Sequence, residues 1–344
     1  MSKHIVHVVG TRPQFPKVAP VYRALDGLFK QTVIHTGQHY DDRLSKEIIE
    51  DTGCHIDVTF PQKTSSGREV SRLARRDVLQ GFLEMHEPDL VMVYGDCNTS
   101  LDAAQAAVNT RTKFAHVEAG LRCWDHRMIE EINRVEIDRY ADILYVPSVD
   151  AVYNLAREGR FFKDIQFVGN VMADSYQWMK ARCTNTFADR HDFALVTMHR
   201  PENVDDEDFM YRFLTTLSVL DFPLIFPKHP RVKLPFVPDN VEVVGPSRYT
   251  TFARWVHQAR FVITDSGGVQ EETTLAHTPC LTVRPNTERP VTITEGTNEL
   301  ACLDTLPSQV SRVRAGGWKR GSIPMYWDGK AAERIACHLR SYLL

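Results

Sequence analysis

Three carboxylates stand where a side chain could take a proton from a substrate or give one back. Asp96 and Glu118 each directly follow a short apolar stretch, and Glu130 precedes a helical pattern. Carboxylates buried near one another are costly unless they are paired or used, and crowding raises the pKa of at least one of them. A proton donor and a proton acceptor then lie side by side, so the pattern predicts acid–base chemistry. The structural alternative is that Glu118 and Glu130 only pair with nearby arginines, which are Arg122, Arg127 and Arg134.

The segment 264–272 (TDSGGVQEE) has the pattern of an anion site. A predicted strand ends there, small residues expose backbone N–H groups, and the N-terminus of a predicted helix favours negative charge. Ser266 can add a hydroxyl, and Gly267 and Gly268 leave the backbone accessible. Glu272 could accept hydrogen bonds from ribose hydroxyls. The alternative is a simple Asp or Ser N-cap.

Basic side chains follow several of the predicted strands. Arg12 comes soon after the first strand, where a guanidinium could grip a diphosphate through two hydrogen bonds, although a surface arginine in a loop is the alternative. His199 and His229 each follow a strand in the second half, and Arg289 is a candidate contact for nucleotide or sugar. These positions favour a substrate that carries phosphate.

The elements that must position these residues alternate between short apolar strands and amphipathic helices. In the first half we predict strands at 5–9, 32–35, 90–94, 114–117 and 143–146, and helices at 17–28, 43–51, 69–85, 101–109 and 131–140. In the second half we predict strands at 193–198, 224–226, 241–244, 261–264 and 280–283, and helices at 205–220 and 269–276. Such alternation predicts an α/β fold with parallel sheets that helices cover on both faces.

The chain of 344 residues is long enough for two domains. We expect Rossmann-like, doubly wound domains at 1–169 and 170–329, and a terminal helix at about 330–344 that packs back on the first domain. Ligands of open parallel sheets bind outside the carboxyl ends of the strands, so we expect an interdomain cleft to hold the substrate.

Composition and charge argue against several classes of function. The formal net charge of −3 argues against a general nucleic-acid binder. No apolar run approaches the length of a membrane span. The seven cysteines are scattered without a C-x-x-C pair, which fits reduced thiols in a cytoplasmic protein and no structural zinc site. Neither a dinucleotide fingerprint nor an ATP-binding P-loop is present.

Seven ordered segments together resemble the non-hydrolysing UDP-N-acetylglucosamine 2-epimerase family. They are GTRP at 10–13, TGQH at 36–39, GD at 95–96, HVEAGLR at 116–122, EEINR at 130–134, DSGGVQEE at 265–272 and TERP at 287–290. The resemblance runs from about residue 6 to about residue 300, and this many motifs in the correct order are highly specific.

The resemblance implies a glycosyltransferase-B-type fold and the interconversion of UDP-N-acetylglucosamine and UDP-N-acetylmannosamine. UDP would be eliminated to leave a 2-acetamidoglucal and then added back with C2 inverted, with no metal or other cofactor. A role in polysaccharide biosynthesis, a homodimer and allosteric activation by UDP-N-acetylglucosamine are further expectations. The implied acid–base residues are Asp96, Glu118 and Glu130, with His199 near the leaving diphosphate. The implied substrate contacts are Arg12, Lys17, Gln38, His39, Arg122, His229, Ser266, Gly267, Gly268, Glu272 and Arg289.

Three positions depart from the family pattern and leave the sugar open. Ile129 stands where proline is usual, Cys97 where threonine is common, and Gln14 where many members have glutamate. Glutamine occurs in relatives that act on modified sugars, so a UDP-2,3-diacetamido uronic acid is an alternative substrate. A glycosyltransferase of the same fold and a sugar-nucleotide sensor without turnover are alternative functions, although a transferase would leave three clustered carboxylates unexplained.

Overall fold

A computed structural model describes residues 2–37, 42–61, 70–161, 164–182 and 190–344. The predicted contacts Gln38 and His39 lie outside these ranges. The chain divides into two compact units, one made of Met1–Ser175 and Met325–Leu344 and the other of Tyr176–Pro324. The division falls inside helix α7 (Val171–Arg182), whereas the sequence analysis placed the boundary just before this helix.

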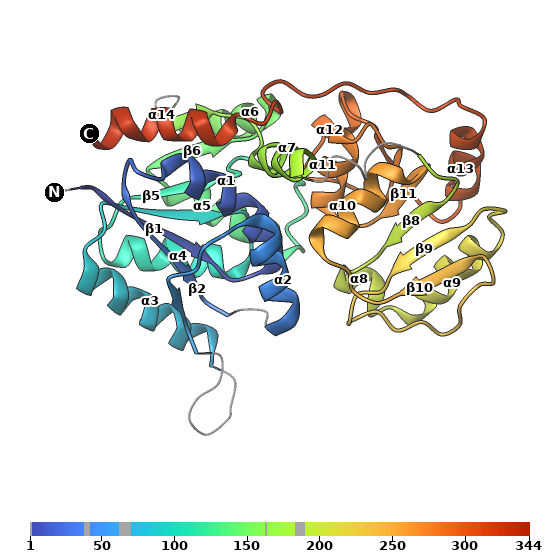
Figure 1. Ribbon diagram of the computed structural model, residues 1–344, viewed down its shortest axis with the longest axis horizontal. Coiled ribbons are helices and arrows are strands. Elements are labelled where there is room, and N and C mark those ends of the chain that lie inside the picture. The colour runs from blue at the N-terminus through green and yellow to red at the C-terminus, as the bar shows by residue number, and fades with distance from the viewer. Residues whose placement is uncertain (1, 38–41, 62–69, 162–163, 183–189) are drawn as a thin grey trace. The chain divides into compact units, whose positions relative to one another are not determined.

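The first unit is built on a seven-stranded, fully parallel sheet (Figure 1). The strand order is β3-β2-β1-β4-β5-β6-β7. The strands are β1 (His4–Val9), β2 (Lys30–His35), β3 (Val58–Thr59), β4 (Leu90–Tyr94), β5 (Phe114–Val117), β6 (Ile143–Val146) and β7 (Ile165–Phe167). Its helices are α1 (Phe15–Leu25), α2 (Asp42–Thr52), α3 (Arg72–His86), α4 (Asn98–Asn109), α5 (Ile129–Tyr140), α6 (Val149–Arg157) and α14 (Ala331–Leu343), and η1 (Arg12–Gln14) is a short 3-10 turn.

Alternation of side chains along the strands gives this sheet two buried faces. Val6 and Val8 of β1 pack in one core with Val91 and Val93 of β4 and with apolar residues of α3, α4, α5 and α6. On the opposite face α1 is buried along most of its length and packs against α14. The start of α14 is fixed by Asp174, which accepts hydrogen bonds from the backbone N–H groups of two residues, Ala331 (3.1 Å) and Ala332 (2.9 Å).

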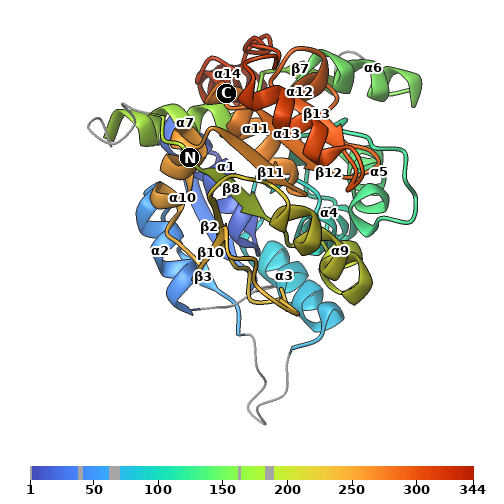
Figure 2. The ribbon, with the colours of Figure 1, turned by 90° about the vertical axis from the view of Figure 1, so that its right-hand side faces the viewer.

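The second unit repeats this plan with a six-stranded parallel sheet (Figure 2). The strand order is β10-β9-β8-β11-β12-β13. The strands are β8 (Ala194–Thr197), β9 (Leu224–Pro227), β10 (Val241–Val244), β11 (Phe261–Thr264), β12 (Cys280–Val283) and β13 (Asn298–Ala301). The helices are α8 (Pro201–Val204), α9 (Glu207–Ser218), α10 (Tyr249–Gln258), α11 (Gly267–Leu275), α12 (Val291–Thr294) and α13 (Leu306–Arg314).

Successive residues of β11 separate the two cores of the second unit. Phe261 and Ile263 face the core that contains α9 and α13. Val262, between them, faces the core that contains α10 and α11. Both faces of the sheet are therefore covered, which explains why its central strands β8, β11 and β12 are largely apolar.

The order of strands places one switch point in each sheet. The chain runs outward in one direction from β1 to β3 and in the other direction from β4 to β7, so β1 and β4 lie side by side where the direction changes. In the second unit β8 and β11 have the same relation. Ligands of doubly wound sheets bind outside the carboxyl ends of strands at this point. The loops after β1, β4, β8 and β11 are therefore the places to search for a site.

The predictions of α/β class, doubly wound parallel sheets and ten strand positions are confirmed. The prediction of one helix over 205–220 is confirmed with tighter bounds, because α9 begins at Glu207, where Asp206 caps it by accepting a hydrogen bond from the Phe209 N–H, and ends at Ser218. Glu130 lies in the first turn of α5 rather than ahead of it. In the described part of the chain no helix is long and apolar enough to cross a membrane.

Candidate active site

A buried ion pair lies at the switch point of the first unit. Lys17, in the first turn of α1, donates a hydrogen bond to Oε2 of Glu118, which follows β5. Only 10% of the Lys17 side chain and 3% of the Glu118 side chain are exposed. Gly95, which follows β4, lies against this pair, because a Cβ atom placed on it would be 3.0 Å from Nζ of Lys17 and 3.1 Å from Oε2 of Glu118.

The backbone of Glu118 has an unusual conformation for a residue with a side chain. Its φ angle is 75°, in the left-handed region. Residues held in such regions cost free energy, on the order of 1–3 kcal/mol each, and concentrate at functional sites. The N–H groups of Glu118 and Ala119 both lie 3.1 Å from the carbonyl oxygen of Tyr145 in β6, which holds this turn in place.

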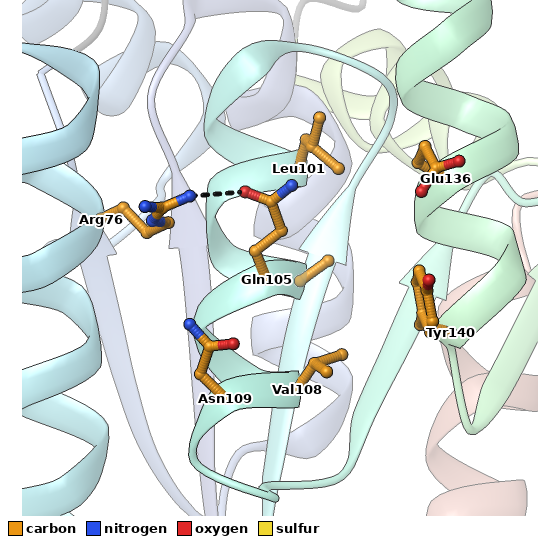
Figure 3. Close-up of a pocket in the computed structure, with 8 residues that line it drawn as sticks. Arg76, Leu101, Gln105, Val108, Asn109, Glu136 and Tyr140 are labelled. Atoms are coloured by element: carbon orange, nitrogen blue, oxygen red, sulfur yellow. Dashed lines mark hydrogen bonds between the residues drawn. The ribbon is translucent and has the colours of Figure 1, made fainter.

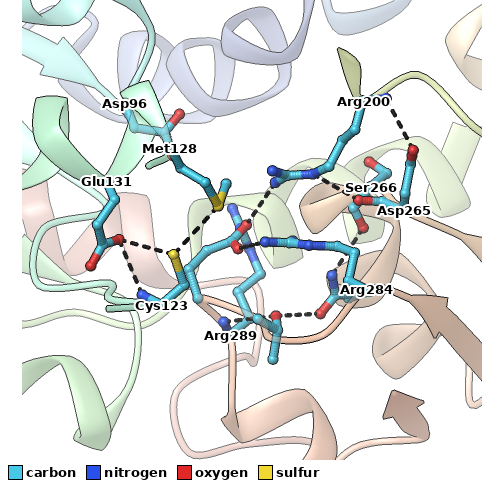
Figure 4. Close-up of polar contacts among 12 residues, drawn as sticks. Asp96, Cys123, Met128, Glu131, Arg200, Asp265, Ser266, Arg284 and Arg289 are labelled. Carbon is cyan, nitrogen blue, oxygen red and sulfur yellow. Dashed lines mark hydrogen bonds and ion pairs between the residues drawn. The ribbon is translucent and has the colours of Figure 1, made fainter. Parts of the chain in front are cut away.

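Asp96 is held by a cation from α5. Nε and Nη2 of Arg134 lie 2.9 Å and 2.7 Å from Oδ2 of Asp96, and Nη1 of the same guanidinium donates to Glu131 (2.5 Å). Arg134 is buried, whereas 29% of the Asp96 side chain is exposed. Glu131 in turn accepts hydrogen bonds from the backbone N–H groups of Cys123 (3.1 Å) and Trp124 (2.9 Å), as Figure 4 shows in part. The loop before α5 and the Asp96 carboxylate are thus fixed by one pair of charges.

A second buried network lies behind these carboxylates. Oδ1 of Asp138 is 2.6 Å from Nδ1 of His116, and Oδ2 accepts from the Gly120 N–H (2.9 Å) and lies 2.8 Å from Nη2 of Arg122. Burial alone raises the pKa of Asp138, but His116, Arg122 and the Gly120 N–H outweigh burial and hold that pKa below its usual value. Arg122 also donates two hydrogen bonds of 2.7 Å to Glu158 and one of 2.8 Å to the Leu121 carbonyl. These bonds favour a structural function for Arg122, and its contact with substrate stays a prediction.

The remaining predicted residues of the first unit differ in their surroundings. Glu130 is half-buried, and within the described ranges its side chain has no hydrogen-bond or ion-pair partner. Arg12 lies half-buried in η1. Gln14 is buried and does not face an open site: its Oε1 accepts from the Gly10 N–H (2.7 Å), and its Nε2 donates to the Tyr94 carbonyl (2.7 Å). Gln14 therefore ties the loop after β1 to the end of β4.

In the second unit a buried carboxylate joins the two loops of the switch point. Asp265, fully buried after β11, accepts hydrogen bonds from the backbone N–H groups of His199 (3.1 Å) and Arg200 (3.0 Å), and one from the side chain of Asn203 (3.0 Å). Nδ1 of His199 is also 3.1 Å from Asp265. Burial raises the pKa of Asp265, but these hydrogen bonds and the nearby His199 outweigh burial and lower it. Of the alternative N-caps for the next helix, Ser266 has the N-cap position but its side chain makes no capping hydrogen bond, and Asp265 binds the loop after β8.

The N-terminus of α11 has the features of an anion site. Ser266 is the N-cap residue and is partly exposed, and α11 begins at Gly267. A Cβ atom on Gly267 would lie 2.4 Å from Nη1 of Arg289 and 2.4 Å from Oε1 of Glu288, so no larger residue fits there. By contrast, no atom lies within 4 Å of a Cβ placed on Gly268. Free backbone N–H groups and the helix dipole favour an anion at such a terminus.

Cations surround this terminus in a buried cluster (Figure 4). Nε of Arg289 donates to Glu271 (2.7 Å), and its Nη1 donates to Glu288. Nη2 of Arg284 is 2.9 Å from Glu288, and Nη2 of Arg200 is 3.7 Å from the same carboxylate. Three guanidinium groups therefore lie beside the α11 N-terminus, and they pair with Glu271, Glu288 and, through Arg200, Glu202 (3.3 Å).

Glu272 is a buried acid of α11 with a raised pKa. Its pKa is about 7, raised chiefly by burial and also by the charge of Glu271, while the hydrogen bond with the Tyr249 hydroxyl acts in the opposite direction. The side chain is only slightly exposed. A carboxyl group in such a place is suited to hydrogen bonding with neutral hydroxyl groups, because no adjacent cation competes for it among the groups that shift its pKa.

The two predicted histidines of the second unit lie near each other. The ring centres of His199 and His229 are 6.2 Å apart, and 40% of the His199 side chain is exposed. His229, after β9, is exposed and accepts a hydrogen bond from the Arg231 N–H (3.2 Å). Both rings can therefore meet a ligand from solvent.

Sequence reasoning missed several residues that hold the site together. Asp138, Glu131 and Asn133 all lie on α5 and are buried, although their side chains are charged or polar. Asn133 donates to the carbonyl of Asp96 (2.9 Å). The available signal was the run of polar residues in EEINR, which places several charged residues on an inward face of a helix.

A groove elsewhere on the first unit is lined by none of the predicted site residues. It lies along α3, α4 and α5, and Arg76 donates to Gln105 across it (3.1 Å) (Figure 3). Within the described ranges, no group of three or more His, Cys, Asp or Glu side chains is arranged to hold a metal ion.

Comparison with known proteins agrees with this arrangement. The two doubly wound α/β units have the glycosyltransferase-B type of fold, and a glycosyltransferase structure shares this fold with a TM-score of 0.61 at 14% identity over both whole chains. The family model for UDP-N-acetylglucosamine 2-epimerase matches residues 23–340. The chain therefore belongs to the UDP-N-acetylglucosamine 2-epimerase family, whose members are isomerases, and the prediction of this family is confirmed.

Individual relatives are similar over nearly their whole length. The UDP-2,3-diacetamido-2,3-dideoxy-D-glucuronate 2-epimerase of Pseudomonas aeruginosa is 33% identical over 97% of this chain and 99% of the relative. The structure of Methanocaldococcus jannaschii UDP-GlcNAc 2-epimerase in complex with UDP-GlcNAc and UDP is 31% identical, with a TM-score of 0.87 over 98% of this chain and 99% of that one.

The two adjacent glycines of α11 give a matched test of the ion cluster. Gly267→Ala is expected to lower the free energy of unfolding by about 1–3 kcal/mol, because its methyl group must displace the buried Arg289–Glu288 pair. Gly268→Ala, with open space around its Cβ, is expected to change it by no more than about 0.5 kcal/mol. Thermal unfolding of both variants measures the difference, and equal midpoints would contradict this packing.

The raised pKa of Glu272 predicts a pH dependence of stability. The pKa of Glu272 in the folded protein (about 7) is above its ordinary value (4.5). Its contribution to the free energy of unfolding is therefore fully present below pH 4.5 and is lost as the pH rises through 7. Glu272→Gln should flatten this fall and be more stable than the parent at pH 8 by about 2 kcal/mol. Thermal unfolding from pH 4.5 to 8 tests this, with Glu242→Gln as the exposed control that keeps the parent profile. If the unfolding temperature of Glu272→Gln fell with pH as steeply as that of the parent, the raised pKa of Glu272 would be contradicted.

Proposed function

We propose that the protein is a non-hydrolysing epimerase that interconverts UDP-N-acetylglucosamine and UDP-N-acetylmannosamine. The observation that carries the proposal is the pair Asp96 and Glu118, which follow the adjacent strands β4 and β5 and are each bound to a buried cation, in a chain of the 2-epimerase family. Two carboxylates held at one edge of a sheet suit a reaction that moves a proton at one carbon in both directions.

The proposed reaction has two half-steps that reverse each other. In the first, a carboxylate takes the proton from C2, the C2–H electrons form a C1=C2 double bond, and the C1–O bond breaks with its electrons on UDP. In the second, UDP adds back to C1, and C2 receives a proton on its opposite face. We assign these proton transfers to Asp96, Glu118 and Glu130 as a group, because one base and one acid must reach opposite faces of C2.

Residues of the second unit would hold the nucleotide. The diphosphate suits the α11 N-terminus, where Gly267 and Gly268 offer backbone N–H groups and Ser266 offers a hydroxyl beside the Arg289 cluster. UDP gains negative charge as the C1–O bond breaks, so fixed cations and N–H groups there stabilise the transition state. Glu272 would accept hydrogen bonds from the ribose hydroxyls, and His199 and His229 would contact the leaving diphosphate. Arg12 and Lys17 are the proposed contacts from the first unit.

A modified sugar is the second candidate substrate. The Pseudomonas aeruginosa relative named for UDP-2,3-diacetamido-2,3-dideoxy-D-glucuronate is 33% identical, close to the values for relatives named for UDP-N-acetylglucosamine. Gln14 does not favour either substrate, because both ends of its side-chain amide bind protein groups. The two substrates differ at C3 and C6, so rates with both separate the candidates.

Exchange of the C2 proton with solvent tests the proposal. In D2O the protein is expected to place deuterium at C2 of UDP-N-acetylglucosamine and to form the C2 epimer, both measured by NMR. Asp96→Asn, Glu118→Gln and Glu130→Gln should each lower kcat by about 10²–10⁴-fold, because each removes a proton-transfer group. Glu136→Gln, on the same helix as Glu130, is the control and should keep the parent rate.

Other outcomes would contradict the proposal in distinct ways. Absence of exchange with every C2 N-acetyl sugar nucleotide, including the diacetamido uronic acid, would rule out an epimerase. Formation of a glycosylated acceptor without exchange would indicate a glycosyltransferase, and tight binding without turnover would indicate a sensor. The homodimer, activation by UDP-N-acetylglucosamine, the cytoplasmic location, the role in polysaccharide biosynthesis and the absence of a cofactor stay predictions.

A further inference from the structure

The buried histidine before Glu118 lies between two groups that can only accept hydrogen bonds. Nε2 of His116 is 3.0 Å from the carbonyl oxygen of Gly95, and Nδ1 is 2.6 Å from Oδ1 of Asp138. The imidazole is completely buried, so water cannot supply a missing proton donor. A neutral imidazole has a single N–H, and its other nitrogen would direct a lone pair at an oxygen.

Asp138 cannot supply the missing proton. Its Oδ2 already receives the Gly120 N–H (2.9 Å) and lies 2.8 Å from Nη2 of Arg122, which is the environment of an ionised carboxylate. Charge balance leads to the same result: Arg122 contacts two carboxylates, Asp138 and Glu158, so a neutral His116 would leave one negative charge in excess. A protonated His116 makes the group of four neutral and places its charge against Asp138, whose side chain is only 1% exposed, whereas the Glu158 side chain is 26% exposed to water.

We propose that His116 is a positioning residue whose two ring nitrogens both carry a proton and whose two N–H groups fix the Gly95–Asp96 peptide to Asp138. The Gly95 N–H is bound by the Val117 carbonyl (3.0 Å), so with His116 both polar groups of Gly95 are held by β5. Asp138 also holds Gly120, two residues beyond the left-handed Glu118. One imidazolium–carboxylate pair therefore sets the backbone on both sides of the carboxylates to which the proposed function assigns proton transfer, and this inference rests on that function.

A second buried histidine in the same sheet shows the contrasting arrangement. His7 in β1 has one donor and one acceptor as neighbours: Nδ1 is 2.7 Å from the Tyr94 hydroxyl and Nε2 is 3.0 Å from Oε1 of Gln31. A neutral ring satisfies both, and burial lowers the pKa of His7 to about 4. His7 is therefore an internal reference for the spectrum and a matched control for mutagenesis.

Nitrogen NMR of the unmodified protein at pH 7 tests the protonation directly. With ¹⁵N-labelled histidine, His116 should show protons on both ring nitrogens, and His7 should show a proton on one. A single N–H on His116 would overturn the proposal. This measurement does not depend on turnover, so it decides the protonation of His116 even if the parent protein exchanges no C2 proton and the proposed function fails.

Two substitutions separate the two hydrogen bonds of His116. The amide nitrogen of Asn can replace Nδ1 and keep the bond to Asp138, whereas that of Gln can replace Nε2 and keep the bond to Gly95. If the bond to Gly95 sets the geometry of Asp96, His116→Asn should lower kcat about 10–100-fold with KM nearly unchanged, and His116→Gln should recover most of that loss. His7→Asn should lower the unfolding temperature but leave kcat within about twofold. Parent-like kcat in folded His116→Asn, or an equal loss in His116→Gln, would overturn the positioning role.

Discussion

The buried ion pair between Lys17 and Glu118 fixes a carboxylate at the edge of the first sheet, where the proposed function places proton transfer. Removing two charges from water costs several kcal/mol per ion, and only close geometry compensates for that cost. The pair is supported on all sides: Gly95 leaves room for it, the Tyr145 carbonyl holds the turn that presents Glu118, and Arg134 holds Asp96 on the neighbouring strand. Because the cost of desolvation offsets most of the attraction between the charges, the ion pair adds little to the stability of the fold. Its effect is to place two carboxylates with fixed orientation at the edge of a parallel sheet.

The second unit has a similar topology, but different charged groups lie at the ends of its strands. Asp265 is negative and fully buried, and its carboxylate holds the loop after β8 by accepting hydrogen bonds from backbone N–H groups of that loop. The guanidinium groups of Arg200, Arg284 and Arg289 lie at the α11 N-terminus, each paired with a carboxylate, while burial and the neighbouring Glu271 raise the pKa of Glu272. One unit thus presents acids and the other presents N–H groups and cations. A sugar joined to a diphosphate needs both kinds of surface.

The fold followed from the sequence because its strands are buried on both faces and therefore read as apolar runs. The short or half-buried strands β3, β7 and β13 do not carry that signal. Asp96 and Glu118 could be found because they follow strand ends. His116 and Asp138 are 22 residues apart and meet only in the tertiary structure, so no local pattern indicates their contact. The sequence predicted that Glu130 precedes a helix beginning at residue 131, whereas α5 begins at Ile129. The start was missed because no proline or capping side chain marks it.

The central claim is that the C1–O bond to UDP breaks and re-forms while the sugar stays bound. Positional isotope exchange tests it most directly, with substrate that carries ¹⁸O in the bridge between C1 and the β-phosphorus. If UDP is eliminated and added back, the β-phosphate rotates and the label moves to non-bridging positions as the C2 epimer accumulates. Complete epimerisation with the label still in the bridge would contradict elimination and would require C2 to invert without cleavage of the C1–O bond.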